Sequence, residues 1–436
     1  MDPFYLGLLS FVVLILFLAI GIPVGIALLV TALPGLFYLM GVVPTFELFV
    51  TKTFDYATGY EFTAMPLFLL VGYIAMHSNL TGPAFDTARI WLARLPGGLA
   101  MATSVGSGLL GACIGSGIPA TAAMARIAIP EMLRHDYDKG LAAGSVAAAG
   151  SVAVLIPPSI VMVVYAVFTE VSLGQMLLAG YLPGLLSVVI YMIMIGVRVH
   201  LNPKLAPSRL HEEITWGRRL RALKDVWGIA LLFFVLLGGI YSGWFTASEA
   251  AGMAAFASFV LMFATRNFRW AAVKDAFSES LQVAAMTFLM LIGATMFVVF
   301  MIITGLPKHI AGMIVAADLP VTAFLIMVCI MYFILGCFLP SMSMLLVTLP
   351  ILLPVLKDLD VNLIWFGIIV IKMVEVGGIS PPFGIGVYVV KGVVGKEIEL
   401  TTIFKGIGWF AVMDFLTLAI LMALPQISLW LPTALK

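Results

Sequence analysis

Charged residues are scarce in this sequence. Only 10% of its 436 residues are charged, 62% are hydrophobic, and the mean hydropathy is +1.15. Soluble domains carry about one quarter charged residues, so the composition excludes an ordinary soluble protein and indicates an all-α polytopic membrane protein. The net charge of +1 offers no basic surface for nucleic acid. We therefore expect the chain to lie in the lipid bilayer, and we expect no nucleic-acid partner.

Cysteine, histidine and the sequence motifs of common enzymes are rare or missing. Cys113, Cys329 and Cys337 all lie in apolar stretches, without the spacing of a disulfide framework or a metal site. The motifs GxxxxGK[ST], GxSxG and HExxH do not occur, and we predict no enzyme activity. No polar segment is long enough for a folded soluble domain. An ATP-driven pump is thereby excluded, and the energy for any transport must come from an ion gradient.

Long apolar runs divide the chain into membrane spans. The run that begins at Phe4 lacks the basic flank and cleavage site of a signal peptide, so we read it as a first span. Polar and aromatic segments at 42–60 and 81–97 are expected to lie along the membrane interface. The uninterrupted spans are predicted as two within 4–41, then 62–79, 175–197, 226–244, 247–265, 281–304 and 406–430.

The apolar stretch Leu109–Pro130 does not read as a continuous helix. Glycines and a proline crowd its centre, and both residue types destabilise a helix interior. Broken helices survive at membrane depth only where protein or a water-lined cavity satisfies the backbone, as at the binding sites of secondary transporters. We predict a re-entrant hairpin over 99–133 with its tip at Gly115–Pro119. The following span, 139–168, is interrupted by Pro157-Pro158.

These features occur twice. Gly115 and Pro119 recur 221 positions later as Gly336 and Pro340, and Pro157-Pro158 recurs as Pro381-Pro382. We predict a first repeat at 1–197, a basic cytoplasmic linker at 198–225 and a second repeat at 226–436, with a hairpin at 320–356 and a broken helix at 361–390. Each repeat has five spans, one of them interrupted, plus its hairpin. Five is odd, so the two repeats must be inverted relative to each other.

The distribution of positive charge predicts the orientation. With 198–225 in the cytoplasm, most of the 23 lysines and arginines lie on that side, as the positive-inside rule requires. Both termini are then extracytoplasmic. The first hairpin enters the membrane from inside and the second from outside.

Neutral oxygen atoms gather at the two breaks and the two hairpin tips. Each proline frees the carbonyl four residues earlier, those of Gly377 and Gly378 among them in the second half. Hydroxyls beside the breaks and tips add further oxygen, which suits a hard cation such as Na⁺. We predict one cation site in each half; the alternative is a pair of helix kinks whose serines bond to their own backbone. The hydroxyl groups concerned are those of Ser116, Thr121, Ser145, Ser151, Ser159, Ser341, Ser343 and Ser380.

A few charges lie within the apolar segments. Lys372 and Glu375 share a helical face, either as a neutralising pair or in a coupling role. Arg126 could attract an anionic substrate, pair with Glu131 or reach the cytoplasmic interface. Thr246 and Glu249 form a capping-box pattern at a helix start, and Asp414 is expected to face another helix. Together with Thr121, Ser159 and Ser343, Arg126 is a candidate for substrate binding.

Four segments resemble the large membrane subunit of tripartite ATP-independent periplasmic (TRAP) transporters. They are GSGIPATAAMARIAIPEM, GSVAVLIPPSIVMVVY, FGIIVIKMVEVGGISPPFG and LVTLPILLPVL. The resemblance implies an elevator-type transporter in the bacterial or archaeal cytoplasmic membrane. It also implies a small four-helix membrane subunit and a periplasmic substrate-binding protein as partners.

The same resemblance implies import of organic anions such as carboxylates, driven by at least two Na⁺ ions. One ion site would fall near Ser116, Gly150, Ser151 and Pro157, and the other near Ser341, Gly377, Gly378 and Ser380. The alternatives are a stand-alone Na⁺- or H⁺-coupled anion transporter and, from another class, an ion channel. Channels build their pores by symmetry between subunits, whereas this chain carries its symmetry within itself. A purely structural membrane scaffold would have no need of two paired breaks.

Overall fold

The chain folds into helices throughout the part that the structure describes. The computed structural model describes residues 2–78, 82–207, 215–316, 320–381 and 384–434, and no β-strand occurs among them. Six helices are long and apolar enough to cross a membrane alone, or up to eight if each of two bent helix pairs forms one span. The predicted all-α polytopic fold is confirmed.

The first half of the chain ends with a long helix that leads into the polar linker. Its elements are α1 (Pro3–Ala19), α2 (Val24–Met40), α3 (Val42–Thr58), the 3₁₀ turn η1 (Tyr60–Thr63), α4 (Ala64–His77), α5 (Gly82–Leu92), α6 (Gly98–Ile114), α7 (Gly117–Arg134), α8 (Lys139–Leu155), α9 (Ile160–Thr169) and α10 (Leu173–Leu201).

The second half follows a short 3₁₀ turn and a linker helix. Its elements are η2 (Pro203–Leu205), α11 (Trp216–Asp225), α12 (Trp227–Phe233), the π-helical turn η3 (Phe234–Gly238), α13 (Gly239–Tyr241), α14 (Ala247–Ala264), α15 (Trp270–Thr304), α16 (Leu306–Ala316), α17 (Val321–Gly336), α18 (Ser341–Asp358), α19 (Leu363–Ile379), α20 (Ile385–Val394), α21 (Leu400–Ala423) and α22 (Gln426–Ala434).

The order of elements repeats. A helical hairpin (α6–α7), a broken helix (α8–α9) and a long helix (α10) are followed in the second half by α17–α18, α19–α20 and α21. The helix bounds fall close to the ranges expected for the hairpins and broken helices; Pro382 of the second break lies outside the described residues. The inversion of the halves in the membrane, and their division at 198–225, stay predictions.

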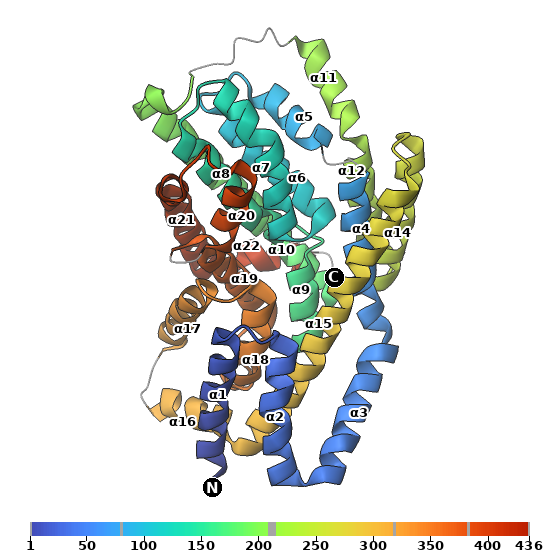
Figure 1. The fold of residues 1–436 in the computed structure, drawn as a ribbon, viewed down its shortest axis with the longest axis vertical. Coiled ribbons are helices and arrows are strands. Elements are labelled where there is room, and N and C mark those ends of the chain that lie inside the picture. The colour runs from blue at the N-terminus through green and yellow to red at the C-terminus, as the bar shows by residue number, and fades with distance from the viewer. Residues whose placement is uncertain (1, 79–81, 208–214, 317–319, 382–383, 435–436) are drawn as a thin grey trace.

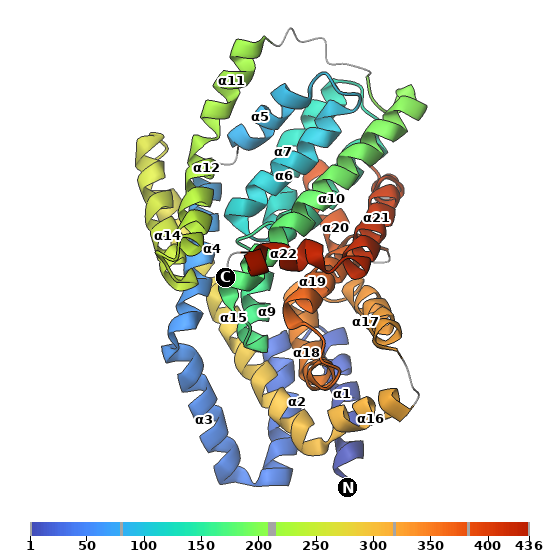
Figure 2. The same cartoon turned by 180° about the vertical axis from the view of Figure 1, so that it is seen from behind.

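The helices form two long sides. In both views α3, α4, α12 and α14 lie along one side, and α17, α19 and α21 along the other (Figure 1 and Figure 2). The long helix α15 packs against α2, against α4 of the first group and also against α18. The hairpins and broken helices are thereby gathered on one side of the molecule, where α8 packs between α6, α7 and α21.

Two span boundaries differ from the prediction. Helix α15 begins at Trp270 rather than at 281, because Ala272, Val273 and Ala276 bury an apolar face against other helices beyond the uniformly apolar run. The last predicted span, 406–430, is two helices, since α21 ends at Ala423. Pro425 has no backbone N–H to continue that helix, and α22 starts anew beyond it.

Candidate functional site

The tip of the first hairpin is bound to the first helix break. Gly115 ends α6 with φ +63°, in the left-handed region that favours glycine. Its carbonyl accepts a hydrogen bond of 3.0 Å from the Ile160 amide at the start of α9. A Cβ atom at Gly115 would lie 2.4 Å from the Pro158 carbonyl oxygen. Only glycine therefore allows this approach of hairpin and break.

The second hairpin meets the second break in a similar way. A Cβ atom built on Gly377 would lie 2.6 Å from the Cα of Gly336, so the two backbones touch. The Cys337 thiol donates to the Pro381 carbonyl at 3.3 Å. One expectation is wrong here: the Gly377 carbonyl is not free, because the chain turns after Ile379 and the Ser380 amide bonds to it at 3.0 Å.

A small cavity of about 50 Å³ lies where the tips of the two hairpins meet α8 and the second broken helix, α19–α20. Its walls come from both halves of the chain, and they include oxygen-bearing side chains and exposed backbone of several glycines. The lining residues are Gly117, Ile118, Thr121, Ala147, Gly150, Ser151, Leu339, Pro340, Ser341, Glu375, Gly378, Ile379, Ile385 and Gly386.

Five of the twelve residues assigned to ion or substrate sites line this one cavity: Thr121, Gly150, Ser151, Ser341 and Gly378. Two separate sites were expected, one in each half, whereas these residues share a single space. Helices α7 and α8 pack tightly at this cavity, since a Cβ atom at Gly150 would lie 2.1 Å from the Thr121 hydroxyl oxygen.

The other assigned residues lie outside the cavity lining. Pro157 and Ser159 are buried at the first break, and Ser380 is buried at the second. Ser159 Oγ has no hydrogen-bond partner among the described residues. Ser116 precedes α7 without capping it, Ser343 is buried in the first turn of α18, and Gly377 packs against Gly336.

Several of the serines bond to their own helix. Ser145, Ser151 and Ser380 donate to the carbonyls of Ala142, Ala148 and Val376 at 3.0, 2.8 and 2.7 Å. These contacts are the ones that the kink interpretation expects. A hydroxyl that donates its proton still has lone pairs, so its oxygen remains a possible cation ligand.

The cavity contains one carboxylate, Glu375. The Ser341 hydroxyl donates to Glu375 Oε1 at 3.0 Å, which joins α19 to the tip of the second hairpin. A Cβ atom at Gly117 would lie 3.3 Å from Glu375 Oε2, so the same carboxylate also lies against the first hairpin. We had assigned Glu375 to an ion pair, but its side chain belongs to the cavity.

Lys372 pairs with Asp414 rather than with Glu375. Its ammonium group lies 2.5 Å from Asp414 Oδ1 and donates to Ser187 Oγ at 3.2 Å. Both charged side chains are completely buried. The expected pairing is wrong because residues at i and i+3 share a helical face without having to face each other, and a closer carboxylate comes from α21.

The Lys372–Asp414 pair extends to the first break through Tyr191. The Tyr191 hydroxyl donates to Asp414 Oδ1 at 2.6 Å and lies 3.2 Å from the Ser151 hydroxyl. Tyr191 and Ser187 were missed because nothing in their apolar helix distinguishes them. Asp414 could have been proposed as the partner of Lys372, since two opposite charges in apolar helices gain from neutralising each other.

Arg126 lies away from the cavity lining, exposed on α7. Within the described part of the chain it has no hydrogen-bond or ion-pair partner. The alternative that it pairs with Glu131 is wrong, because Glu131 is engaged by Arg89 at 3.1 Å and by Arg134 at 3.8 Å. The capping box of Thr246 and Glu249, by contrast, is confirmed.

A second, larger cavity of about 1150 Å³ opens between the two long sides of the molecule. Its lining includes Lys52 and Asp55 of the α3 arm, Glu170 beyond the first broken helix and Lys357 at the end of the second hairpin. The charges of both signs distinguish this space from the apolar grooves of the surface. It is large enough for a small organic molecule.

The fold and the paired breaks define a polytopic helical membrane transporter. The structure is similar to the YdaH transporter of Alcanivorax borkumensis, with a TM-score of 0.61 at 16% identity over 90% of this chain and 89% of that one. It is also similar to MtrF of Neisseria gonorrhoeae, with a TM-score of 0.59 at 15% identity over 97% and 95%. At such identities the likeness concerns the fold alone.

The family follows from the sequence. Residues 11–427 match the DctM component of the tripartite ATP-independent periplasmic transporters, and the chain belongs to this family. It is 34% identical to the C4-dicarboxylate TRAP transporter large permease DctM of Pseudomonas aeruginosa, over 87% of this chain and 88% of the relative. It is 27% identical to the sialic acid TRAP transporter large permease SiaM of Vibrio cholerae, over 94% and 95%.

A third relative is the isethionate TRAP transporter permease DctMQ of Oleidesulfovibrio alaskensis, 30% identical over 88% of this chain and 60% of the relative. The chain is therefore the large permease of a TRAP transporter, a multi-pass membrane protein and not an enzyme.

Proposed function

We propose that this permease imports organic anions, with carboxylates as the main class, and that inward movement of Na⁺ drives the import. The observation that carries the proposal is the small cavity at which both hairpin tips meet α8 and the second broken helix. The relatives are named for C4-dicarboxylates, sialic acid and isethionate, all of which are organic anions.

The chemistry of the cavity supports Na⁺ as the coupling ion. Its polar atoms are hydroxyl, carbonyl and carboxylate oxygens, the ligands that hard cations prefer. Ser341 donates to Glu375 and Ser151 to Ala148, which leaves oxygen lone pairs on both hydroxyls for an ion. The unpartnered Ser159 hydroxyl at the first break supplies a further buried oxygen. We propose at least two Na⁺ ions as co-transported cargo.

The two-sided arrangement supports an elevator mechanism. The hairpins and the two proline-interrupted helices pack together with α10 and α21, whereas the bends on the other side, between α4 and α5 and between α11 and α12, contain no proline pair. In this proposal the side that holds the hairpins and broken helices moves against the other side and exposes the cavity alternately to the two faces of the membrane. The larger cavity between the groups would then be part of the path of the substrate.

Two partners complete the proposed importer. Membership in a tripartite family favours a small four-helix membrane subunit and a periplasmic protein that binds the substrate and delivers it. The positive-inside rule favours the cytoplasmic membrane of a bacterium or archaeon, with both termini extracytoplasmic. The second candidate is a stand-alone Na⁺- or H⁺-coupled anion transporter with the same paired hairpins and broken helices.

Uptake into proteoliposomes tests the proposal. The permease would be reconstituted with its small subunit, and uptake of labelled succinate, sialic acid and isethionate would be followed. Binding protein and an inward Na⁺ gradient would each be present or withheld, with an equal K⁺ gradient as the control. Uptake that requires both supports the proposal. Uptake without the binding protein would favour the stand-alone transporter, and uptake under K⁺ would exclude Na⁺ coupling.

A further inference from the structure

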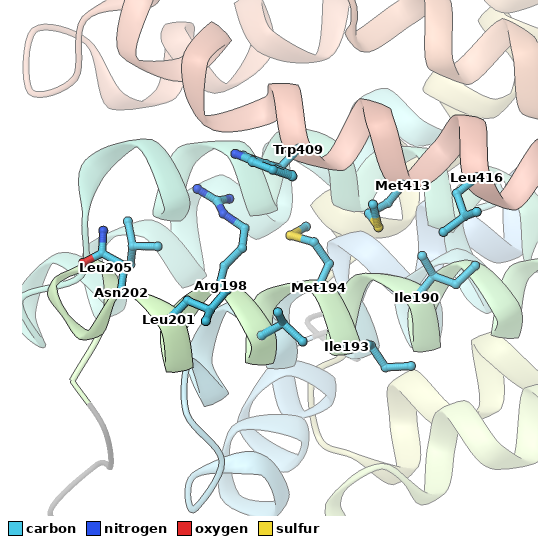
Figure 3. Close-up of a pocket in the computed structure, with 11 residues that line it drawn as sticks. Ile190, Ile193, Met194, Arg198, Leu201, Asn202, Leu205, Trp409, Met413 and Leu416 are labelled. Carbon is cyan, nitrogen blue, oxygen red and sulfur yellow. The ribbon is translucent and has the colours of Figure 1, made fainter.

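A groove separate from the transport cavity lies between α10 and α21. Its volume is about 630 Å³, and it is lined almost entirely by apolar side chains (Figure 3). Ile193 and Leu201 on its rim are 61% and 77% exposed, so this face points away from the protein core. In a protein that crosses the membrane, exposed apolar side chains of this kind meet the hydrocarbon of the bilayer.

One positive charge lies at the end of the groove nearest the polar linker. The Arg198 side chain rises from the last turn of α10 toward Trp409, with the guanidinium carbon 5.5 Å from the ring centroid (Figure 3). Its Nη1 atom is buried, and it has no hydrogen-bond partner among the described residues. A buried donor without a partner is costly, so an acceptor is expected at this place.

No side chain of the groove supplies that acceptor. Asp138 acts on Arg198 electrostatically, but among the described residues it forms no hydrogen bond or ion pair with the guanidinium; its Oδ1 atom caps α8 by accepting from the Leu141 amide at 2.9 Å. Asn202 lines the same end of the groove, and its oxygen accepts from the Lys204 amide at 3.3 Å. The amide nitrogen of Asn202 remains as a second donor beside Arg198.

The dimensions fit one lipid chain. Between Arg198 and Ile190 the groove follows α10 for about 12 Å at 1.5 Å per residue. One leaflet of the hydrocarbon core is about 15 Å thick. A lipid whose phosphate lies at Arg198 would therefore extend its acyl chain along the groove to Ile190 and Leu416. Basic pockets between membrane helices recognise anionic headgroups in this way.

We propose that this groove binds one anionic phospholipid, with the phosphate at Arg198 and Asn202 and an acyl chain between α10 and α21. The charge of the pocket selects an anionic occupant, because an apolar protein helix would leave the buried Arg198 donor without an acceptor, whereas a lipid phosphate supplies one. The inference is independent of the ion and substrate proposed above. Because α10 and α21 pack against the broken helices, the lipid would contact the moving group of an elevator.

Quenching of Trp409 by brominated lipid tests the proposal. The permease, purified with its small subunit, would be reconstituted in phosphatidylcholine vesicles that contain brominated phosphatidylglycerol or brominated phosphatidylcholine. The chain has eight tryptophans, so the Trp409 signal is obtained by subtraction of the Trp409→Phe variant. A single arginine near the surface favours the anionic lipid about five-fold, and the quenching of Trp409 should show that preference.

Variants of the groove and a matched arginine decide the outcome. Arg198→Gln should abolish the preference and Arg198→Lys should retain part of it, while Arg134→Gln at the exposed end of α7 should leave it unchanged. Met413→Phe should lower quenching by both lipids, because the larger side chain fills the groove. Equal quenching by the two lipids in the wild type would refute headgroup recognition. Absence of quenching by either would show that protein covers the groove.

Discussion

Removal of the Asp414 charge should destabilise the permease more than any other single conservative substitution in its membrane helices. Lys372 and Asp414 are both completely buried, and Asp414 is the only carboxylate within ion-pair distance of Lys372 among the described residues. Asp414→Asn keeps the shape of the side chain but leaves Lys372 as an uncompensated buried charge. Breaking such a pair costs about 3–5 kcal/mol. The hydrogen bond from Tyr191 also loses its charged acceptor.

Thermal unfolding in detergent, followed by tryptophan fluorescence, measures the effect. A loss of this size corresponds to a fall in Tm of roughly 3–5 °C for a chain of this length. Asp275→Asn, on an exposed turn of α15, is the control and should stay within about 0.5 kcal/mol of the wild type. The double variant Lys372→Met, Asp414→Leu removes both charges and should recover most of the loss. An unchanged Tm for Asp414→Asn, or a double variant as unstable as the sum of the single ones, would refute the reasoning.

Three further predictions concern the cavity and a helix cap. Gly150→Ala should reduce uptake at least ten-fold at normal expression, because the added Cβ would meet the Thr121 hydroxyl at 2.1 Å. Gly392→Ala, with open space around it, is the control. Unaffected uptake by Gly150→Ala would show that α7 and α8 can separate freely. Glu375→Gln should raise the Na⁺ concentration for half-maximal uptake about ten-fold without a comparable loss of protein, and an unchanged Na⁺ dependence would remove Glu375 from the ion path. Thr246→Ala should cost about 1 kcal/mol in thermal unfolding with uptake retained, and a Tm equal to the wild type would mean that the capping box does not stabilise α14.

Glycine, proline and capping patterns predicted the helices and their breaks well, but they did not predict which side chains of different helices contact each other. Glycine and proline chemistry located both hairpins and both breaks, because these residues act on the backbone where they stand. The capping box of Thr246 and Glu249 was found for the same reason. The Lys372–Asp414 pair joins residues 42 positions apart in sequence, and Tyr191 joins Asp414 over 223 positions. Such contacts depend on how the helices rotate and pack against each other. The spacing of residues within one helix carries no information about that packing.

One cation site in each half stays a prediction, but the same limit applies to where the assigned residues meet. Symmetry between the halves suggested one cluster of oxygens at each break, and each half taken alone supports that interpretation. The common cavity exists because α19 carries Glu375 from the second half to the first hairpin, against Gly117. The Glu375 carboxylate, which belongs to the second half alone, therefore contacts the hairpins of both halves. A sequence repeat predicts equivalent backbones; it does not predict which side chain enters the space between them.

The contacts of α19 bear on how the halves could move. One turn of this helix holds Lys372, bonded to Ser187 of α10 and Asp414 of α21, and the next holds Glu375, bonded to Ser341 of the second hairpin and lying against the first. The second hairpin, two long helices and a broken helix are thus joined through polar contacts that would be costly to break in the membrane, and the first hairpin packs against the same Glu375 carboxylate. We infer that they move as one unit. An elevator requires this property, whereas a mechanism that opens one hairpin at a time must first break the Glu375–Ser341 bond.

Cross-linking of the two tips through cysteines at Ile118 and Leu339, which line the same cavity, separates these possibilities. Transport that survives the cross-link would support movement as one unit, and transport abolished by it would require the tips to part.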